Sequence, residues 1–272
     1  MSDTSLTRIA IAGAAGRMGQ ALSTLCLGDE TLKLVGASEA PSYHNIGKDV
    51  GELIGLGKTG IVLRSDVAAA ADDAQCYVDF TRPKVTLNAI SSLRKTGVRA
   101  LVIGTTGFSD DEMVALKENT RDFAIVYSGN FSLGVNMLSA LVERAAKSLG
   151  EDWDIEVLET HHRHKVDAPS GTALLLGEAA ARGRGGELKD MKLPPYDGVT
   201  GERPPGRIGF SVRRSGGVIG EHEVSFSSME EVLSLSHSAL DRKVFARGAL
   251  RAAKWVVSQP PGFYSMTDVL GL

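Results

Sequence analysis

Short β-branched and apolar runs alternate with helical patterns in the first half of the chain, and this alternation restricts the fold more than any other feature. Strands separated by helices usually pair in parallel, because each connection must cross back over the sheet. A doubly wound α/β domain with a parallel sheet is therefore predicted. Pro83 and the pair Ser109 and Glu112 mark two helix starts, as a first-turn proline and a capping box. The six predicted strands are Ile9–Ala12, Leu32–Ser38, Ile61–Leu63, Tyr77–Phe80, Leu101–Ile103 and Phe123–Tyr127.

The pattern changes after Tyr127, where strands begin to follow one another. The later half predicts an α+β domain with a mixed, largely antiparallel sheet, in which Ser215-Gly216-Gly217 is the hairpin turn between two strands. The predicted elements are helices at Leu133–Leu149 and Thr172–Arg182, and strands at Asp154–Thr160, Arg207–Arg214, Val218–Ser227 and Glu231–Ser236.

A last amphipathic helix is predicted to begin near Ser238, whose spacing to Asp241 suits a capping box. Its apolar stripe needs a core to cover it, and we expect the helix to return to the first domain. The predicted domains are then 1–131 with 238–272, and 132–237. The Gly- and Pro-rich segment Gly183–Gly206 has no predicted structure, and such a loop is either a lid or merely mobile.

Composition and charge restrict the class of protein further. A chain of 272 residues corresponds to about two domains. With 30 Lys and Arg against 33 Asp and Glu, its net charge of -3 provides no general attraction for nucleic acid or an anionic membrane. Apolar runs fall far short of the roughly 20 residues of a membrane span, and the polar start Met1–Arg8 does not resemble a signal peptide, so a cytoplasmic location is expected. Cys26 and Cys76 favour buried thiols over a disulfide or a metal site.

Three glycines join the first predicted strand to a helix in the segment Ile9–Gln20. Gly13 permits a tight turn, Gly16 keeps side chains away from a pyrophosphate at the helix N-terminus, and Gly19 lets the helix pack closely on the strand. The spacing is GxxGxxG instead of GxGxxG, so the motif alone is weak. Glu39 directly follows the second predicted strand and lies 20 residues beyond Gly19. In this position a carboxylate meets the ribose hydroxyls of a dinucleotide. Together these features predict a Rossmann-like dinucleotide site.

Three other predicted strands end in polar or glycine-rich turns, at Asp79–Pro83, Gly104–Gly107 and Ser128–Phe131. Ligands of open α/β sheets bind at the carboxyl ends of the strands. We therefore expect these turns to line the ribose and the nicotinamide, with Asn130 as a hydrogen-bond partner. Ordinary turn chemistry is the alternative for each turn.

The segment Glu159–Ala173 (ETHHRHKVDAPSGTA) holds three of the six histidines of the chain within four positions. A zinc site is disfavoured, because no thiolate is near and Arg163 and Lys165 would repel the ion. A solvated basic loop is a second alternative. However, Pro169–Thr172 opens a helix whose N–H groups attract an anion, and the loop supplies cations nearby, which together suit a small dicarboxylate. Imidazole and ammonium groups can also transfer protons, so acid/base catalysis is predicted.

These motifs resemble the 4-hydroxy-tetrahydrodipicolinate reductase (dihydrodipicolinate reductase) family over essentially the whole chain. The resemblance implies hydride transfer from NADH or NADPH to C4 of an unsaturated cyclic dicarboxylate, giving tetrahydrodipicolinate for diaminopimelate and lysine synthesis. No metal is implied, and the substrate domains would pair their sheets in a homotetramer. The peptides that carry the resemblance are Gly13–Gly19, Asp79–Pro83, Gly104–Phe108, His161–Ala173 and Gly220-Glu221-His222.

The resemblance also implies roles for individual residues. His161 is the acid/base candidate and Lys165 the proton donor, while His162, Lys165 and the backbone of Gly171 and Thr172 hold a substrate carboxylate. The cofactor-binding residues that it implies are Gly13, Ala14, Ala15, Gly16, Arg17, Met18, Glu39, Gly104, Thr105, Thr106, Ser128, Gly129, Asn130 and Phe131.

Glu39 departs from the pattern of family members that use NADPH well, in which a basic residue often follows the acidic one. Here Ala40 and Pro41 follow, so the carboxylate should repel a 2′-phosphate and favour NADH, with residual NADPH use through Arg17, Lys48 or Arg82. Two other functions stay open. One is a binding protein that senses the redox state of the dinucleotide, and the other is a two-domain dehydrogenase of a different amino-acid precursor.

Overall fold

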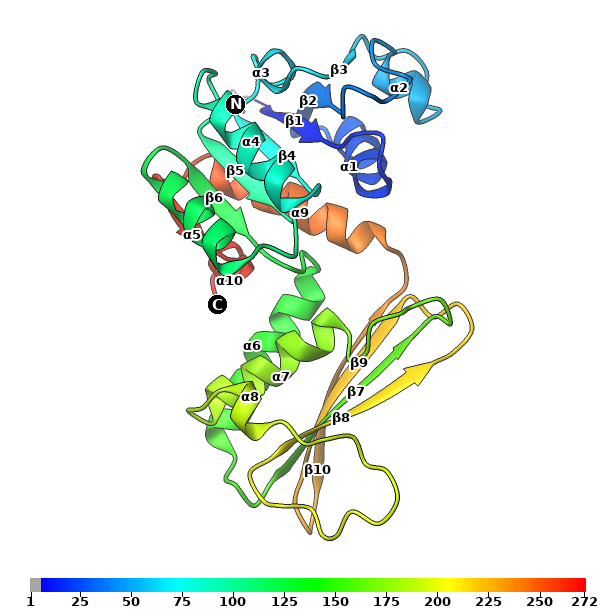
Figure 1. Ribbon diagram of the computed structural model, residues 1–272, viewed down its shortest axis with the longest axis vertical. Coiled ribbons are helices and arrows are strands. Elements are labelled where there is room, and N and C mark those ends of the chain that lie inside the picture. Colours follow the sequence, from blue (N-terminus) through cyan, green and yellow to red (C-terminus); the bar gives the residue numbers. More distant parts are fainter. Residues whose placement is uncertain (1–5) are drawn as a thin grey trace. The chain divides into compact units, whose positions relative to one another are not determined.

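The computed structural model describes residues 6–272, which form two compact units (Figure 1). The first unit runs to Phe131 and includes Lys243–Gly271, and the second is Ser132–Arg242, to which Leu272 is assigned. Met1–Ser5, most of the polar start that argues against a signal peptide, lie outside the described residues. No helix within residues 6–272 combines the length and the apolar character that a bilayer crossing requires.

The first unit is built on a seven-stranded parallel sheet with the order β11-β6-β5-β4-β1-β2-β3. This order reverses at β1, and such a reversal leaves a crevice at the carboxyl ends of the strands. All six predicted strands are present, the third displaced to Leu63–Arg64. The prediction missed β11, which has only three residues. The strands are β1 (Thr7–Ala12), β2 (Leu32–Ser38), β3 (Leu63–Arg64), β4 (Cys76–Asp79), β5 (Ala100–Ile103), β6 (Ala124–Tyr127) and β11 (Gly262–Tyr264).

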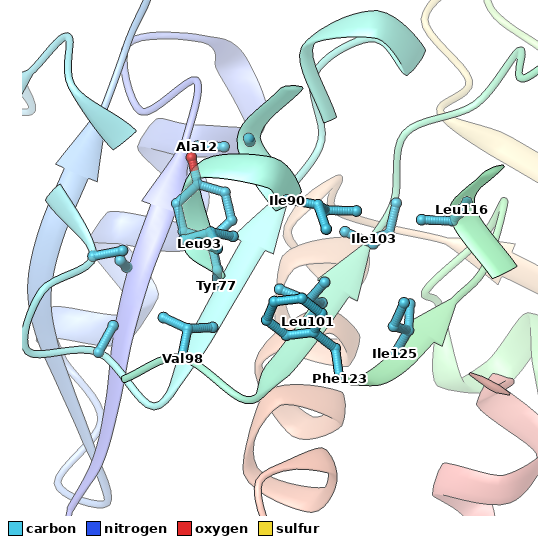
Figure 2. Packing of buried hydrophobic residues seen from close by; sticks show 14 residues of the cluster. Ala12, Tyr77, Ile90, Leu93, Val98, Leu101, Ile103, Leu116, Phe123 and Ile125 are labelled. Atoms are coloured by element: carbon cyan, nitrogen blue, oxygen red, sulfur yellow. The ribbon is translucent and has the colours of Figure 1, made fainter. Parts of the chain in front are cut away.

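Helices cover both faces of this sheet, which makes the unit doubly wound as predicted. On one face Ile90 and Leu93 of α4 and Leu116 of α5 pack against Leu101 and Phe123 in a buried cluster (Figure 2). On the other, α9 contacts α1 and the strands β4, β5 and β6, so the last long helix returns to the first unit. The helices are α1 (Arg17–Leu27), α2 (Val50–Leu53), α3 (Val67–Ala70), α4 (Pro83–Leu93), α5 (Asp110–Glu118), α9 (Lys243–Val256) and α10 (Met266–Leu270), with a 3₁₀ turn at Asn119–Arg121.

Several local predictions in this unit are confirmed. Pro83 lies in the first turn of α4, and Ser109 and Glu112 form the reciprocal capping box of α5. Cys26 and Cys76 are both free and buried. Burial raises the pKa of the Cys26 thiol to about 12, because the thiolate would lose its hydration.

The second unit is a four-stranded sheet, β10-β9-β7-β8, with α6 and α7 packed on one face (Figure 1). Its core joins Leu138 of α6 and Leu176 of α7 to Val157 and Phe226 of the sheet. The elements are α6 (Leu133–Ser148), β7 (Asp154–His161), α7 (Gly171–Gly183), α8 (Leu188–Met191), β8 (Ile208–Arg214), β9 (Gly220–Ser227) and β10 (Val232–Ala239).

The hairpin predicted at Ser215-Gly216-Gly217 is wrong. β8 is an edge strand that pairs with β7, in parallel, and β7 pairs on its other side with β9, antiparallel. β7 therefore lies between the two strands that were expected to be neighbours. The turn sequence could not show that an earlier strand enters between them. The sheet is nevertheless mixed and largely antiparallel, as predicted.

The helix start predicted at Ser238 is also wrong. β10 continues to Ala239, paired with Gly220, and α9 begins at Lys243. Between Ser236 and Ala239 exposed serines alternate with half-buried residues, and this period of two outweighs the local capping spacing.

The segment Gly183–Gly206 carries more structure than predicted. It contains α8, and Arg203 donates hydrogen bonds to the Ile155 carbonyl (2.6 Å) and to Glu156 Oε2 (2.9 Å) on β7. A lid made from this segment remains a prediction, and these contacts would have to break for the segment to move.

Candidate active site

The glycine turn after β1 has the geometry of a phosphate cradle. Gly13 has a φ of +58°, in the left-handed region that favours glycine, and its carbonyl accepts a hydrogen bond from Gly16 N–H at 2.9 Å. A Cβ on Gly19 would overlap the Gly13 carbonyl oxygen and Ala14 Cα. Gly16 caps α1 without any side-chain hydrogen bond from the described residues, which leaves the first N–H groups of the helix to an anion.

Glu39 lies next to this turn. Its Oε2 accepts the Ala15 N–H at 3.1 Å and its Oε1 accepts the Ala40 N–H at 2.9 Å. The structure therefore brings together the two parts of the dinucleotide motif. It also reveals Arg64, which sequence reasoning missed: the Glu39 N–H donates to the Arg64 carbonyl at 2.9 Å, across the pairing of β2 with β3.

Asp79 ties together the turns that follow β4 and β5. Its Oδ1 accepts hydrogen bonds from the Thr81 N–H (2.8 Å), the Thr81 hydroxyl (2.6 Å) and the Thr105 hydroxyl (3.3 Å). Burial raises the pKa of Asp79. The Thr105 side chain is buried in this network, whereas Thr106 is exposed. A Cβ on Gly104 would overlap the Phe80 ring, which explains the glycine.

The turn after β6 is held by Ser128, whose hydroxyl donates to the Asn130 carbonyl at 2.7 Å. Phe131 is 1% exposed and packs on Phe80, with ring centroids 5.3 Å apart. Any contact of Phe131 with a ligand would therefore come from its backbone. Of the predicted residues in the α1 turn, Arg17 is exposed and Met18 is half-buried.

Strand register gathers a second set of polar residues at one end of the β7–β10 sheet. Glu159 and His161, two residues apart on β7, share one face because strand side chains alternate. Glu159 lies opposite His222 on β9, and His161 lies opposite Arg214 on β8. Sequence reasoning gave Glu159 no catalytic role and did not find Arg214.

Glu159 is a buried carboxylate with several donors around it. Its Oε2 accepts from Arg214 Nη1 (3.0 Å) and contacts His161 Nδ1, while its Oε1 accepts from the Ser170 N–H (2.8 Å) and from Arg214 Nη2 (3.2 Å). Burial raises the pKa of Glu159, but the hydrogen bonds from Arg214, Ser170 and His161 outweigh it, and the net shift is downward. This carboxyl is therefore ionised near neutral pH.

The two buried histidines beside it have lowered pKa values. Burial is the main cause for His161, opposed by Glu159 and assisted by the charges of Lys165 and Arg214. Burial also lowers the pKa of His222 to about 4. The His222 ring packs edge-on against His161, with centroids 5.0 Å apart, and its Nε2 lies 3.1 Å from the Ser170 hydroxyl.

The loop after β7 holds the other predicted residues. His162 Nε2 lies 3.0 Å from a guanidinium nitrogen of Arg242, and Lys165 Nζ contacts both oxygens of Asp167, at 2.8 and 2.9 Å. Arg242 is a second residue that sequence reasoning missed. Arg242 lies 80 residues after His162 in the sequence, so no local pattern connected the two residues.

α7 begins directly beside this loop. Ser170 is its N-cap, and the Ser170 hydroxyl accepts the Ala173 N–H at 3.1 Å. Gly171 and Thr172 form the first turn, where helix N–H groups lack an intrahelical carbonyl partner and favour an anion. The structure thus brings together His161, His162, Lys165 and the start of α7 within the second unit. The predicted cofactor residues all belong to the first unit.

Glu159, His161 and His222 could each offer one ligand atom to a metal, with these atoms within 4.8 Å of one another. However, Arg214 already donates to both oxygens of Glu159, so a cation there would face a guanidinium. This geometry suits hydrogen-bonded imidazole better than a metal centre.

The first unit supplies a Rossmann-type sheet, a glycine turn at its switch point and a strand-end carboxylate. The second supplies a buried histidine pair beside a lysine and a helix N-terminus. Together they define a two-domain, nicotinamide-dependent oxidoreductase.

Comparison with known proteins identifies the family. Residues 7–131 match the family model described as dihydrodipicolinate reductase, N-terminus, and residues 134–270 match the model for its C-terminus. The chain is 52% identical over 273 residues to the 4-hydroxy-tetrahydrodipicolinate reductase of Rhizobium rhizogenes strain K84, covering 100% of this chain and 99% of that protein. The chain therefore belongs to the dihydrodipicolinate reductase family, which confirms the resemblance in its sequence.

Solved structures share the fold. A dipicolinate-bound dihydrodipicolinate reductase from Paenisporosarcina sp. TG-14 matches with a TM-score of 0.75 at 23% identity, covering 97% of this chain and 98% of that one. An amine dehydrogenase from Mycobacterium smegmatis matches with a TM-score of 0.64 at 15% identity, covering 97% and 95%. At these identities the likeness concerns the two-domain architecture alone.

Proposed function

We propose that the protein transfers a hydride from NAD(P)H to C4 of the cyclic dicarboxylate derived from 4-hydroxy-tetrahydrodipicolinate, giving tetrahydrodipicolinate for diaminopimelate and lysine synthesis. The observation that carries the proposal is the cluster in which a buried, carboxylate-bonded His161 lies beside Lys165 and the start of α7. The relative named 4-hydroxy-tetrahydrodipicolinate reductase, which matches over the full length, supports the choice of substrate. A sensor of dinucleotide redox state would have no use for such proton-transfer groups.

In the proposed reaction Lys165 donates the proton that completes the reduction, and His161 acts as the acid/base group. His162, Lys165 and the N–H groups of Gly171 and Thr172 hold a substrate carboxylate. Lys165 is bonded to the exposed Asp167 in this structure, and exposed ion pairs are worth only about 0–1 kcal/mol. A substrate carboxylate can therefore replace Asp167 at little cost.

The cofactor, when bound, supplies the hydride. The residues proposed to hold it are those of the Gly13–Met18 turn, Glu39, Gly104–Thr106 and Ser128–Phe131. The turn fits a pyrophosphate, because α1, which follows it, begins without a side-chain cap on its first N–H groups and Gly19 allows close packing. We propose that NADH is preferred, since Glu39 accepts the Ala15 N–H and is oriented for ribose hydroxyls.

A homotetramer and a cytoplasmic location remain proposals, the first from the family resemblance and the second from the sequence. The alternative function for the same two units is a dehydrogenase that acts on another amino-acid precursor. It would use the same cofactor residues with a different acid as substrate.

The direct test follows nicotinamide absorbance at 340 nm with substrate generated enzymatically from its precursors. The expected result is NADH oxidation that depends on both the protein and the substrate, with omission of the substrate as the control. Cofactor binding without oxidation would refute the reductase and favour the sensor.

A further inference from the structure

Glu159 and Arg214 form a buried clamp around one nitrogen of His161. The Glu159 side chain is 1% exposed, and the guanidinium of Arg214 binds both of its oxygens, at 3.0 and 3.2 Å. The same guanidinium donates to the Asp167 carbonyl at 2.6 Å, which ties the clamp to the loop that carries Lys165. Glu159 and Arg214 therefore connect His161 to the loop that carries Lys165, and these are the two predicted proton-transfer groups.

The hydrogen bonds assign the proton on His161. An ionised carboxylate only accepts, so the Nδ1 that contacts Glu159 must carry a hydrogen. In the neutral ring Nε2 is then the nitrogen with a lone pair. It lies beside Gly220, where a Cβ would come within 3.1 Å of it.

His162 has a different arrangement. A guanidinium only donates, so Nε2 of His162 accepts from Arg242 at 3.0 Å and is already occupied. Of the two adjacent histidines, His162 thus has its Nε2 bonded to a protein cation, whereas His161 contacts its charged partner through Nδ1.

We propose that Glu159, held by Arg214, is a positioning residue that keeps the proton of neutral His161 on Nδ1, so that Nε2 is the nitrogen that exchanges protons during catalysis. The inference rests on the proposed function, because it assumes that His161 is the acid/base group. It adds a requirement for one carboxylate and one guanidinium outside the basic loop.

The geometry predicts what an amide would do in place of this carboxylate. The Oε1 site receives two fixed donors, Ser170 N–H and Arg214 Nη2, whereas the Oε2 site receives one, Arg214 Nη1, beside an imidazole that can change its tautomer. The amide oxygen of Glu159→Gln should therefore occupy the Oε1 site. The amide NH₂ then faces His161 Nδ1 and donates to it. His161 must therefore move its proton to Nε2, the wrong tautomer for the proposed role.

The groups that face His161 also predict the pH response. These are Glu159 on its own strand, Arg214 on β8, His222 on β9 and Lys165 in the loop. Removing the one negative charge among them should lower the pKa of His161 further. The limb of the pH profile that reports this histidine should shift to lower pH.

The test combines histidine NMR with kinetics on the full chain. In ¹⁵N-histidine-labelled protein, His161 is assigned by the resonances that disappear in His161→Gln, and the tautomer is determined from the two ring nitrogens. Wild type should carry the proton on Nδ1 and Glu159→Gln on Nε2. We expect kcat to fall roughly 10²-fold or more in Glu159→Gln, with KM within about twofold, because loss of an orienting carboxylate can reach ~10⁴-fold.

Glu156→Gln is the matched control. Glu156 also lies on β7 and pairs with an arginine, Arg203, at 2.9 Å, but on the opposite face of the sheet. It should leave the His161 tautomer unchanged and kcat within about threefold of wild type.

Several outcomes would overturn the proposal. Wild-type His161 with its proton on Nε2 would do so without any variant, even if Glu159→Gln fails to fold. A Glu159→Gln protein with the wild-type tautomer and pH profile would do the same. The tautomer is measured without turnover, so an inactive wild-type protein would refute the proposed function and leave this inference to the NMR result.

Discussion

Cofactor preference can be predicted from the surroundings of Glu39. The carboxylate is oriented by the Ala15 N–H at 3.1 Å, beside the glycine turn, and the two residues directly after it, Ala40 and Pro41, are not basic. In this position a carboxylate takes the ribose hydroxyls, so the 2′-phosphate of NADPH would meet a like charge. We expect NADH to be the better cofactor.

The size of the effect follows from Coulomb's law. Two like charges about 4 Å apart repel by ~1 kcal/mol in water and by ~4 kcal/mol at the effective dielectric of a protein surface. Glu39 is half-buried, so a value near 2 kcal/mol is expected, which is roughly a 30-fold difference in kcat/KM. Arg64, whose backbone accepts the Glu39 N–H, is a cation that could reduce this difference.

The assay compares kcat/KM for NADH and NADPH at low and high salt. Glu39→Gln should reduce the preference to within about threefold, mainly by improving NADPH, and salt should weaken the wild-type preference because screening reduces the repulsion. Glu30→Gln, an exposed acid just before β2, is the matched control and should leave the ratio unchanged. Equal efficiencies of the wild-type protein with both cofactors would refute the reasoning, as would a ratio that Glu39→Gln does not change.

Three further predictions concern the second unit. His161→Ala and Lys165→Ala should each lower kcat ~10²-fold or more, the scale for losing a proton-transfer group, and a near-normal rate in stopped-flow or steady-state assays would remove that residue's role. We expect the Thr172 hydroxyl to bind the carboxylate together with the backbone N–H groups, so Thr172→Val should weaken a dicarboxylate inhibitor in a calorimetric titration while changing kcat less. An unchanged affinity would remove the hydroxyl from the carboxylate site. Because burial lowers the pKa of His222 from 6.5 to about 4, the unfolded chain binds a proton first as pH falls. Wild type should therefore lose up to about 3 kcal/mol of stability between pH 6.5 and pH 4 in urea unfolding. His222→Gln should show a flatter pH dependence. The same pH dependence in the variant and the wild type would mean that His222 is already charged in the folded protein.

The sequence predicted the first unit well because its signals are local. The glycine turn, the strand runs and the capping box of Ser109 each depend on residues that are close to one another in the sequence. The sheet of the second unit was harder, because β7 enters between β8 and β9 and no turn sequence encodes that insertion. The false helix start at Ser238 shows the same weakness, since the pairing of β10 with β9 decides the end of that strand.

The same difference between local and long-range contacts applies to the candidate site. His161, His162 and Lys165 stand close together in the sequence, and that spacing was enough to group them as one candidate site. Arg214 and Arg242 reach them only through the fold. Glu159 was within reach of the sequence, because a carboxylate two residues before His161 on a strand must share its face.

The charges in this site explain why a dicarboxylate could exchange with one acid and not with the other. Glu159 is buried and receives hydrogen bonds from Arg214 and Ser170, so displacing it from these donors would leave a buried carboxylate without its partners, a loss of several kcal/mol. The Asp167 carboxylate is about half exposed and forms its ion pair with Lys165, so exchanging it costs about 1 kcal/mol or less. An incoming carboxylate should therefore take Lys165 and leave the Glu159 clamp intact. In the proposed reaction the same cation would bind substrate and donate a proton, while the buried carboxylate would keep His161 in one tautomer throughout.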